Sequence, residues 1–287
     1  MALNEYGALR RVALRHAREA LRGQAAIERE WRALGYPAAP DFARAVAESD
    51  RFAEILAAAG AELVYLDRAE DLTLDSLYVR DASLVAPGGS ILCNPGKAAR
   101  VPEAAAAGRL LAAAGETVLG GIEGAGLIEG GDLVWFDARS CAVALGYRTN
   151  AEGIAQLRAL LGPEVEVVAV PLPHYKGPED VFHLMSILSP LDRDLALVYS
   201  PLMPVPFRQW LLARGMTLVE VPDEEFETMG CNVLALGPRQ GLMVEGNPET
   251  RRRLEAAGCA VQTYEGNEIS LKGAGGPTCL TRPLARE

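Results

Sequence analysis

Hydrophobic positions along the chain follow one pattern that occurs five times. An amphipathic helix rich in Ala, Leu and Arg ends at a glycine, and a short strand rich in Val follows it. The five segments are "FAEILAAAGAELVYL" (52–66), "GRLLAAAGETVLG" (108–120), "IAQLRALLGPEVEVVAV" (154–170), "FRQWLLARGMTLVEV" (207–221) and "TRRRLEAAGCAVQTY" (250–264). A self-similar unit of about this length is typical of a propeller, a solenoid or another repeat architecture.

The glycines of these segments stand where a helix ends in the left-handed conformation that glycine adopts most easily. They are Gly60, Gly115, Gly162, Gly215 and Gly258, and they are separated by 43 to 55 residues. Each is therefore predicted to end the helix of its own repeat.

A cluster of polar residues follows each strand at a regular distance from its glycine. Asp81, His183 and Cys279 all lie 21 residues beyond their glycines, and Asp132 and Asn232 both lie 17 residues beyond theirs. Around a pseudo-fivefold axis, such equivalent positions converge at the centre. An open α/β sheet would also contain helix–strand repeats, but two short apolar runs per unit favour blades. We therefore predict a five-bladed, pseudo-fivefold symmetric α/β propeller that forms a single catalytic domain over residues 1–287.

The N-terminal region differs from the repeats. "YGALRRVALR" (6–15) has the composition of a strand that completes the last blade and closes the ring. "HAREALRGQAAIEREWRALG" (16–35) is helical in pattern, with a thin apolar stripe. It is either a lid over a central pocket or a plain surface helix.

Composition excludes several classes of protein. The net charge of -10 makes nucleic acid an unfavourable partner, while 49% hydrophobic residues are enough to bury a large core. The sequence contains no signal peptide and no run of 18 apolar residues, so we expect no membrane segment and a cytoplasmic location. Five scattered cysteines without a C-x-x-C motif fit a reducing compartment better than a disulfide framework or a thiolate zinc site.

Cysteine, histidine and a carboxylate together are the components of nucleophilic catalysis. A free thiol has a pKa of about 8.5, so Cys279 needs a base or a nearby cation to become reactive. His183 is one candidate for that role, although its apolar neighbours also fit a histidine satisfied within the core.

Four carboxylates lie in or beside hydrophobic strands: Asp75, Asp81, Glu129 and Asp132. Buried carboxylates require a partner, which here is either a metal ion or a positively charged ligand. "EGGD" (129–132) is also compatible with a tight turn. Arg100 and Arg148 complement the acids, since the planar guanidinium of arginine suits a carboxylate. Acids at one end of a pocket and arginines at the other fit a zwitterion with a cationic head group, such as arginine.

These residues occur in motifs that resemble a known superfamily. In chain order the motifs are "DSLYVRD" (75–81), "IEGGD" (128–132), "RTNAEG" (148–153), "FHL" (182–184) and "GGPTC" (275–279). Together they resemble the guanidino-group modifying enzymes, the five-bladed pentein superfamily of dimethylarginine dimethylaminohydrolase, arginine deiminase and the amidinotransferases. The resemblance is greatest to dimethylarginine dimethylaminohydrolase and extends from about Tyr65 to the C-terminus.

The resemblance implies hydrolysis of arginine or an Nω-methylated arginine to citrulline through a covalent S-alkylthiouronium. It implies that Cys279 is the nucleophile, His183 the general acid and base, and Glu129 the partner of the histidine. It assigns the guanidinium to Asp81 and the α-carboxylate to Arg100 and Arg148. Asp75 and Tyr78 are expected in the substrate site, and Asp132 and Asn232 behind it. The expected partner is a small guanidino compound, and no metal or cofactor is expected. The resemblance leaves open whether the protein forms a homodimer.

Two positions depart from the pattern of the family. Arg80 stands where dimethylargininases often carry an acid, and Met185 stands where arginine deiminases carry an aspartate. An apolar Met185 favours a methylated substrate, whereas Arg80 leaves the choice of head group open. Alternatives from the same chemistry are arginine deiminase and amidinotransferase. A non-catalytic binding propeller is a further alternative, and a cysteine peptidase fits less well.

Overall fold

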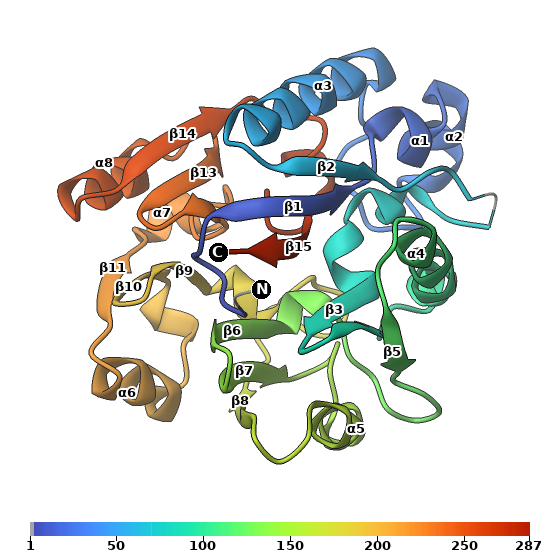
Figure 1. The fold of residues 1–287 in the computed structure, drawn as a ribbon. Coiled ribbons are helices and arrows are strands. Elements are labelled where there is room, and N and C mark those ends of the chain that lie inside the picture. Colours follow the sequence, from blue (N-terminus) through green and yellow to red (C-terminus); the bar gives the residue numbers. More distant parts are fainter. Residues whose placement is uncertain (1–2, 70) are drawn as a thin grey trace.

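Five small sheets surround a central axis in the computed structural model, which describes residues 3–69 and 71–287 (Figure 1). In spatial order the sheets are β15, β1 and β2 (Arg282–Arg286, Leu9–Leu14, Glu62–Tyr65); β3, β4 and β5 (Ser83–Ala86, Gly89–Leu92, Val118–Gly121); β6, β7 and β8 (Leu133–Asp137, Ser140–Leu145, Glu166–Pro171); β9, β10 and β11 (Leu188–Asp192, Leu195–Val198, Thr217–Glu220); and β12, β13 and β14 (Leu234–Gly237, Gln240–Val244, Ala260–Tyr264). The fold is therefore the predicted five-bladed α/β propeller.

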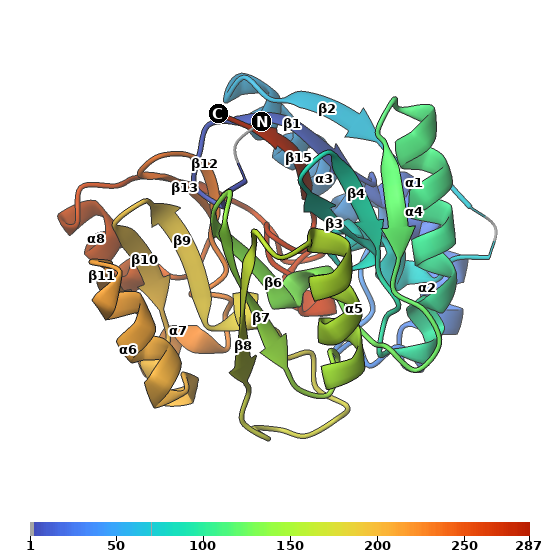
Figure 2. The ribbon, with the colours of Figure 1, turned by 60° about the horizontal axis from the view of Figure 1, so that its bottom comes forward.

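Each blade repeats one topology. An inner strand pairs antiparallel with the middle strand, and a helix then crosses over to an outer strand that runs parallel to the middle one. The crossover helices lie on the outside of the ring (Figure 2). The helices are α1 (Ala17–Leu21), α2 (Gln24–Glu30), α3 (Phe42–Ala58), α4 (Val101–Ala113), α5 (Ala151–Leu161), α6 (Val205–Ala213), α7 (Asp223–Phe226) and α8 (Pro248–Ala256).

The five predicted glycines end these crossover helices. All have positive φ angles, between 78° and 90°. An added Cβ at Gly60 would meet nothing within 4 Å, so the glycine serves the backbone conformation and not a close contact. The pattern of helix, glycine and strand is confirmed in every blade.

The first and last strands close the ring. β1 pairs antiparallel with β15, with Val12 opposite Pro283, and parallel with β2. The prediction of a closing strand near the N-terminus is confirmed. The detail differs, because β15 joins the blade that β1 and β2 form, and both ends of the chain share one sheet (Figure 1).

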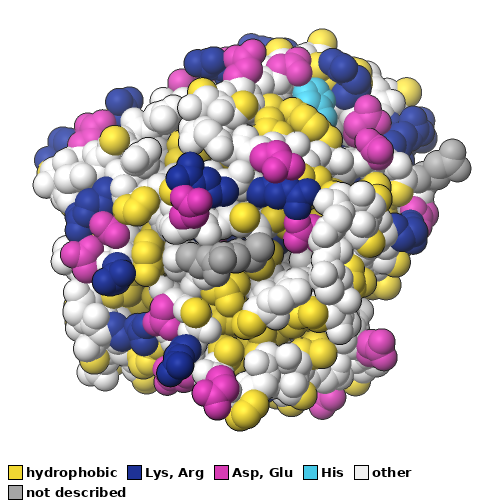
Figure 3. Space-filling model, in the orientation of Figure 1, with side chains coloured by type: hydrophobic (Ala, Val, Ile, Leu, Met, Phe, Trp, Pro, Cys, Tyr) yellow, Lys and Arg dark blue, Asp and Glu magenta, His cyan; other side chains and the backbone are white. Residues whose placement is uncertain are grey.

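The core lies within and between the blades. Every residue of β10 is buried, which explains why the strand is a continuous apolar run and not an alternating one. None of the helices among residues 3–69 and 71–287 is long and apolar enough to span a bilayer. On the face shown in Figure 3, lysine and arginine side chains stand beside acidic ones and form no continuous basic surface.

Candidate active site

Polar side chains at the inner ends of the blades hold the neighbouring blades in place. Each accepts a hydrogen bond from a backbone N–H of the next blade. The pairs are Asp81 with Gly131 (2.8 Å), Asp132 with Leu184 (3.1 Å) and Asn232 with Thr278 (3.1 Å). Asp81, Asp132 and Asn232 thus share one structural role, which is to fix the inner turn of the adjacent blade, although their offsets from the glycines differ.

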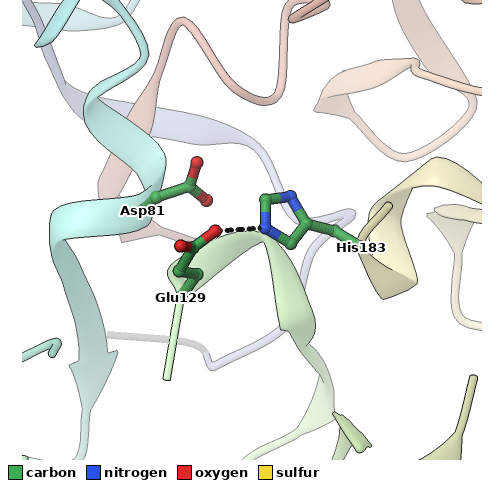
Figure 4. A group of neighbouring side chains, drawn as sticks. All are labelled: Asp81, Glu129 and His183. Carbon is green, nitrogen blue, oxygen red and sulfur yellow. Dashed lines mark hydrogen bonds and ion pairs between the residues drawn. The ribbon is translucent and has the colours of Figure 1, made fainter. Parts of the chain in front are cut away.

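Three of the predicted residues form one buried cluster. A carboxylate oxygen of Asp81, a carboxylate oxygen of Glu129 and a ring nitrogen of His183 all lie within 4.8 Å of one another. They come from three successive blades and point toward a common centre (Figure 4). The predicted convergence at the axis therefore brings these three side chains together.

His183 and Glu129 form a short hydrogen bond. Nε2 of His183 lies 2.6 Å from Oε2 of Glu129, and both side chains are buried. Burial alone would lower the pKa of His183, but the charges of Asp81 and Asp132 and the bond to Glu129 outweigh it and raise the pKa to about 9. The imidazole is consequently protonated at neutral pH.

Glu129 stays ionised despite its complete burial. Burial would raise its pKa, but the hydrogen bond and charge of His183, together with the charge of Arg148, hold the pKa below its ordinary value. Nη1 of Arg148 lies 3.3 Å from both oxygens of Glu129, and the backbone N–H of Lys97 donates at 3.3 Å. This carboxylate therefore balances two cations.

Arg100 is engaged by protein groups on every side. Its Nη1 donates to Oδ2 of Asp81 at 2.5 Å, and its Nε and Nη2 donate to the carboxylate of Glu103 at 3.0 and 2.7 Å. Nη2 also donates to the backbone oxygen of Tyr78 at 2.7 Å. Burial opposes the charged form, yet Glu103 and Asp81 raise the pKa of Arg100 above its ordinary value. The guanidinium fixes Asp81 in place.

Cys279 lies in a tight turn within "GAGGPTC". A Cβ added at Gly275 would come within 2.4 Å of the Tyr78 ring, so glycine lets the backbone pass against the tyrosine. The thiol lies 3.7 Å from Nδ2 of Asn232 and is half-buried. Burial and the charge of Asp81 raise the pKa of Cys279, and the contacts of Thr278 and Asn232 offset part of that effect. Without a cation beside it, this thiol is protonated.

A cavity of about 600 Å³ opens onto the thiol. It is large enough for an amino-acid-sized ligand. Its wall includes the predicted residues Asp75, Tyr78, Asp81, Arg100, Arg148 and Cys279. The hydroxyl of Tyr78 donates to the backbone oxygen of Ile269 at 3.1 Å, which holds the ring against the cavity floor.

The N-terminal region supplies one wall of the cavity. The segment 32–36, directly after α2, lines it together with residues 273–275 and 178–181. Of the two interpretations of residues 16–35, this position favours a cover over the pocket.

Lys97 enters the cavity from the turn before Arg100. Its Nζ lies 2.6 Å from Oδ2 of Asp75 and 2.7 Å from the backbone oxygen of Leu34. The contact with Asp75 is an ion pair without hydrogen-bond alignment. The motif "NPGK" (94–97), which comes shortly after β4, is a weak sequence signal for this residue.

Arg80 and Met185 both point away from the cavity. Nε of Arg80 donates to the backbone oxygen of Thr278 at 2.9 Å, and its Nη1 lies 3.4 Å from Glu5. Arg80 therefore adds no charge to the cavity wall. Met185 is buried in an apolar cluster with Leu188 and lines a different, much smaller void. Its apolar character consequently offers no argument about the head group of a substrate.

The cluster of Asp81, Glu129 and His183 has a composition that could hold a metal ion. Its charges are already balanced, however. Arg100 neutralises Asp81, and His183 and Arg148 neutralise Glu129. A divalent cation would have to displace these partners, whereas a hydrogen-bonding cation could share the remaining oxygen lone pairs.

Two short polar side chains support the cluster without having been predicted, and a third unpredicted residue lies at the rim of the cavity. Thr149 donates from Oγ1 to Oδ2 of Asp132 at 2.6 Å and accepts from the backbone N–H of Glu129. Ser186 accepts from the backbone N–H of His183 at 3.1 Å. Tyr147 is exposed on the cavity rim. Short polar side chains of this kind are too common in sequences to stand out before the fold is known.

Comparisons with known proteins give a consistent family. A family model described as arginine deiminase matches residues 203–286. The N(G),N(G)-dimethylarginine dimethylaminohydrolase of Streptomyces coelicolor is 31% identical over 242 residues, which cover 84% of this chain and 86% of that protein. The uncharacterized protein YkgA of Bacillus subtilis is 33% identical over 159 residues, and the match spans 55% of this chain and about half (52%) of YkgA.

A solved structure has the same fold. It is a dimethylarginine dimethylaminohydrolase from Pseudomonas aeruginosa, a cysteine-to-serine variant complexed with citrulline. It superposes with a TM-score of 0.75 at 22% identity and covers 96% of this chain and 98% of that one. At this level of identity the likeness concerns the arrangement of the blades.

Proposed function

The chain belongs to the dimethylarginine dimethylaminohydrolase family of guanidino-group modifying enzymes, and we propose that it hydrolyses the guanidinium group of arginine or an Nω-methylated arginine. The products are citrulline and an amine. One observation carries the proposal: a histidine bonded to a buried glutamate lies beside Asp81, and Asp81 and the Cys279 thiol line the same cavity.

The charge balance of the site favours a cationic head group. Oδ1 of Asp81 binds the Gly131 N–H and Oδ2 binds Arg100, and the carboxylate still lines the cavity beside Cys279. A guanidinium placed there hydrogen-bonds Asp81 and stabilises the thiolate through its charge. Substrate binding thus supplies a cation beside the thiol, and the thiol proton passes to the solvent because His183 is already protonated.

The reaction then proceeds in two displacements. The Cys279 thiolate forms a bond to the guanidinium carbon, the bond from that carbon to the leaving amine breaks, and His183 gives its proton to the departing nitrogen. Neutral His183 next takes a proton from water, whose oxygen bonds to the same carbon. The carbon–sulfur bond breaks and the hydroxyl proton of the adduct passes to the solvent, which returns the thiolate and releases the neutral ureido product.

The arginines have separate roles in this scheme. Arg100 positions Asp81, because its donors are taken up by Asp81, Glu103 and Tyr78. Arg148 contacts Glu129 only at 3.3 Å and lines the cavity, so it can turn toward a substrate carboxylate. We assign recognition of the carboxylate to Arg148 and not to Arg100.

The test is a panel of guanidino compounds with the released amine identified. Ammonia from arginine, and methylamine or dimethylamine from methylated arginines, would identify the substrate, with citrulline measured in parallel. Cys279→Ser should abolish turnover, whereas Cys259→Ser, which lies in an apolar cluster outside the cavity wall, should retain it. Wild-type turnover by Cys279→Ser would refute the assignment of the nucleophile.

Arginine deiminase activity is the second candidate, favoured by the family match over residues 203–286. It requires the same side chains and differs in the leaving group. Ammonia release from unmethylated arginine, with no amine from methylated forms, would decide for it.

A further inference from the structure

Lys97 occupies the position in the cavity where an ammonium group of a ligand would bind. Its Nζ lies between the carboxylate of Asp75 (2.6 Å) and the backbone oxygen of Leu34 (2.7 Å). A carboxylate and a carbonyl oxygen are the acceptors that an α-ammonium group uses. Both Lys97 and Asp75 line the 600 Å³ cavity that contains Cys279.

The remaining carboxylates of the cavity do not replace Asp75. Asp81 lies beside the thiol, at the end assigned to the guanidinium. Glu179 is exposed and Asp180 is half-buried, so both are open to water, where an ion pair contributes little. Asp75 is therefore the best acceptor in the cavity for the α-ammonium group of a substrate, and Lys97 already neutralises it.

The same arrangement supplies cations for a carboxylate. Lys97 and Arg148 both line the cavity, and Lys97 has one further donor hydrogen beside those that face Asp75 and Leu34. Within residues 3–69 and 71–287, the polar contacts of Arg148 are long, at 3.3 Å to Glu129 and 3.5 Å to the backbone oxygen of Asp180. A carboxylate between these two side chains would meet charge-assisted donors without any rearrangement of Asp75.

We propose that the preferred substrate class is a guanidino acid without a free α-ammonium group, in which Lys97 substitutes for that group on Asp75 and Leu34 while Lys97 and Arg148 bind the carboxylate. This inference rests on the proposed function and narrows its substrate. Arginine binds only after it displaces the Lys97 ammonium from two acceptors, one of them charged. That exchange should lower kcat/KM by about 10- to 100-fold, the size of a lost charge-assisted hydrogen bond.

The experiment compares arginine with desamino-arginine (δ-guanidinovalerate), Nα-acetylarginine and agmatine, which lacks the carboxylate. The wild-type protein should prefer the first two analogues over arginine by about 10-fold or more, and agmatine should be poor. Lys97→Met keeps the length of the side chain and removes its charge. This variant should have a higher kcat/KM for arginine and a lower kcat/KM for desamino-arginine, so the order of the two substrates should reverse.

Lys272→Met is the matched control. Lys272 also pairs with a buried carboxylate, that of Glu268 at 2.7 Å, and its side chain is 24% exposed, against 23% for Lys97. This variant should leave the order of substrates unchanged. A preference of the wild-type protein for arginine, or an unchanged order in Lys97→Met, would overturn the inference.

Binding to the Cys279→Ser protein, measured by calorimetry, separates this inference from the proposed function. If no compound is hydrolysed, the proposed function fails, and the binding order of desamino-arginine over arginine still tests the role of Lys97. Equal binding of the two compounds, or binding of neither, would exclude that role.

Discussion

Nε2 of His183 lies 2.6 Å from Oε2 of Glu129, and both side chains are buried. A histidine in a dry site would ordinarily be neutral, since burial disfavours the imidazolium. Here the surrounding carboxylates reverse that preference and raise the pKa of His183 to about 9. The pair thus keeps a proton ready for a leaving group at neutral pH.

Glu129→Gln tests this relationship directly. The amide keeps the shape of the side chain but removes the Glu129 charge, which stabilises the imidazolium together with the charges of Asp81 and Asp132. The pKa of His183 should fall from about 9 toward its ordinary value near 6.5, which an NMR titration of the imidazole would measure. Turnover at neutral pH should fall at least ~100-fold. An unchanged titration curve would exclude Glu129 as the cause.

The same shift predicts how stability depends on pH. The pKa of His183 is higher in the folded protein than in the unfolded chain, so its contribution is complete below pH ~6.5 and is lost as the pH rises through about 9. Urea unfolding at pH ~6.5 and above pH ~9.5 should therefore differ by a few kcal/mol. His183→Gln should lose less stability over this range, and an equal loss would point to other groups.

Gly131→Ala should displace the histidine. An added Cβ would lie 2.6 Å from Nδ1 of His183 and 3.0 Å from Oδ1 of Asp81, closer than packed atoms approach. Turnover should fall about 100-fold, the contribution of a well-placed general acid, while the fold is retained. Gly237→Ala is the control, because its Cβ would meet ordinary contacts at 3.6 Å or more. Equal activity of the two variants would contradict the geometry.

Arg100→Lys distinguishes positioning of Asp81 from direct binding of a carboxylate. Lysine keeps the charge but cannot bridge Asp81 and Glu103, so stability should fall by about 2–4 kcal/mol. If Arg100 acts through Asp81, kcat/KM should fall by the same factor for arginine and for agmatine. A loss confined to substrates with a carboxylate would instead indicate that Arg100 binds them directly.

Much of the site could be inferred from the sequence because the repeat fixes it. The glycines determine where each helix ends, and the constant offset then determines which residues reach the axis. This is why Asp81, His183 and Cys279 could be selected before any coordinates. Backbone periodicity carries this information, and it survives divergence of the side chains.

The contacts of long side chains could not be inferred in the same way. Arg100, Lys97 and Arg80 occur within about 20 residues of one another, yet they face Asp81, Asp75 and Glu5 respectively. Their directions depend on rotamers chosen by tertiary packing. The prediction that Met185 contacts the substrate is wrong for a similar reason. Met185 lies two residues after His183, and its side chain packs in the apolar core.

The pairing of β1 with β15 links the nucleophile to a distant part of the chain. Cys279 precedes β15 by only a few residues, and β15 is held in its blade by β1, which lies far earlier in the sequence. Contacts at so large a sequence separation close a long loop, so they form late in folding. We therefore expect the histidine and the carboxylates to be in place before folding brings the thiol to the cavity.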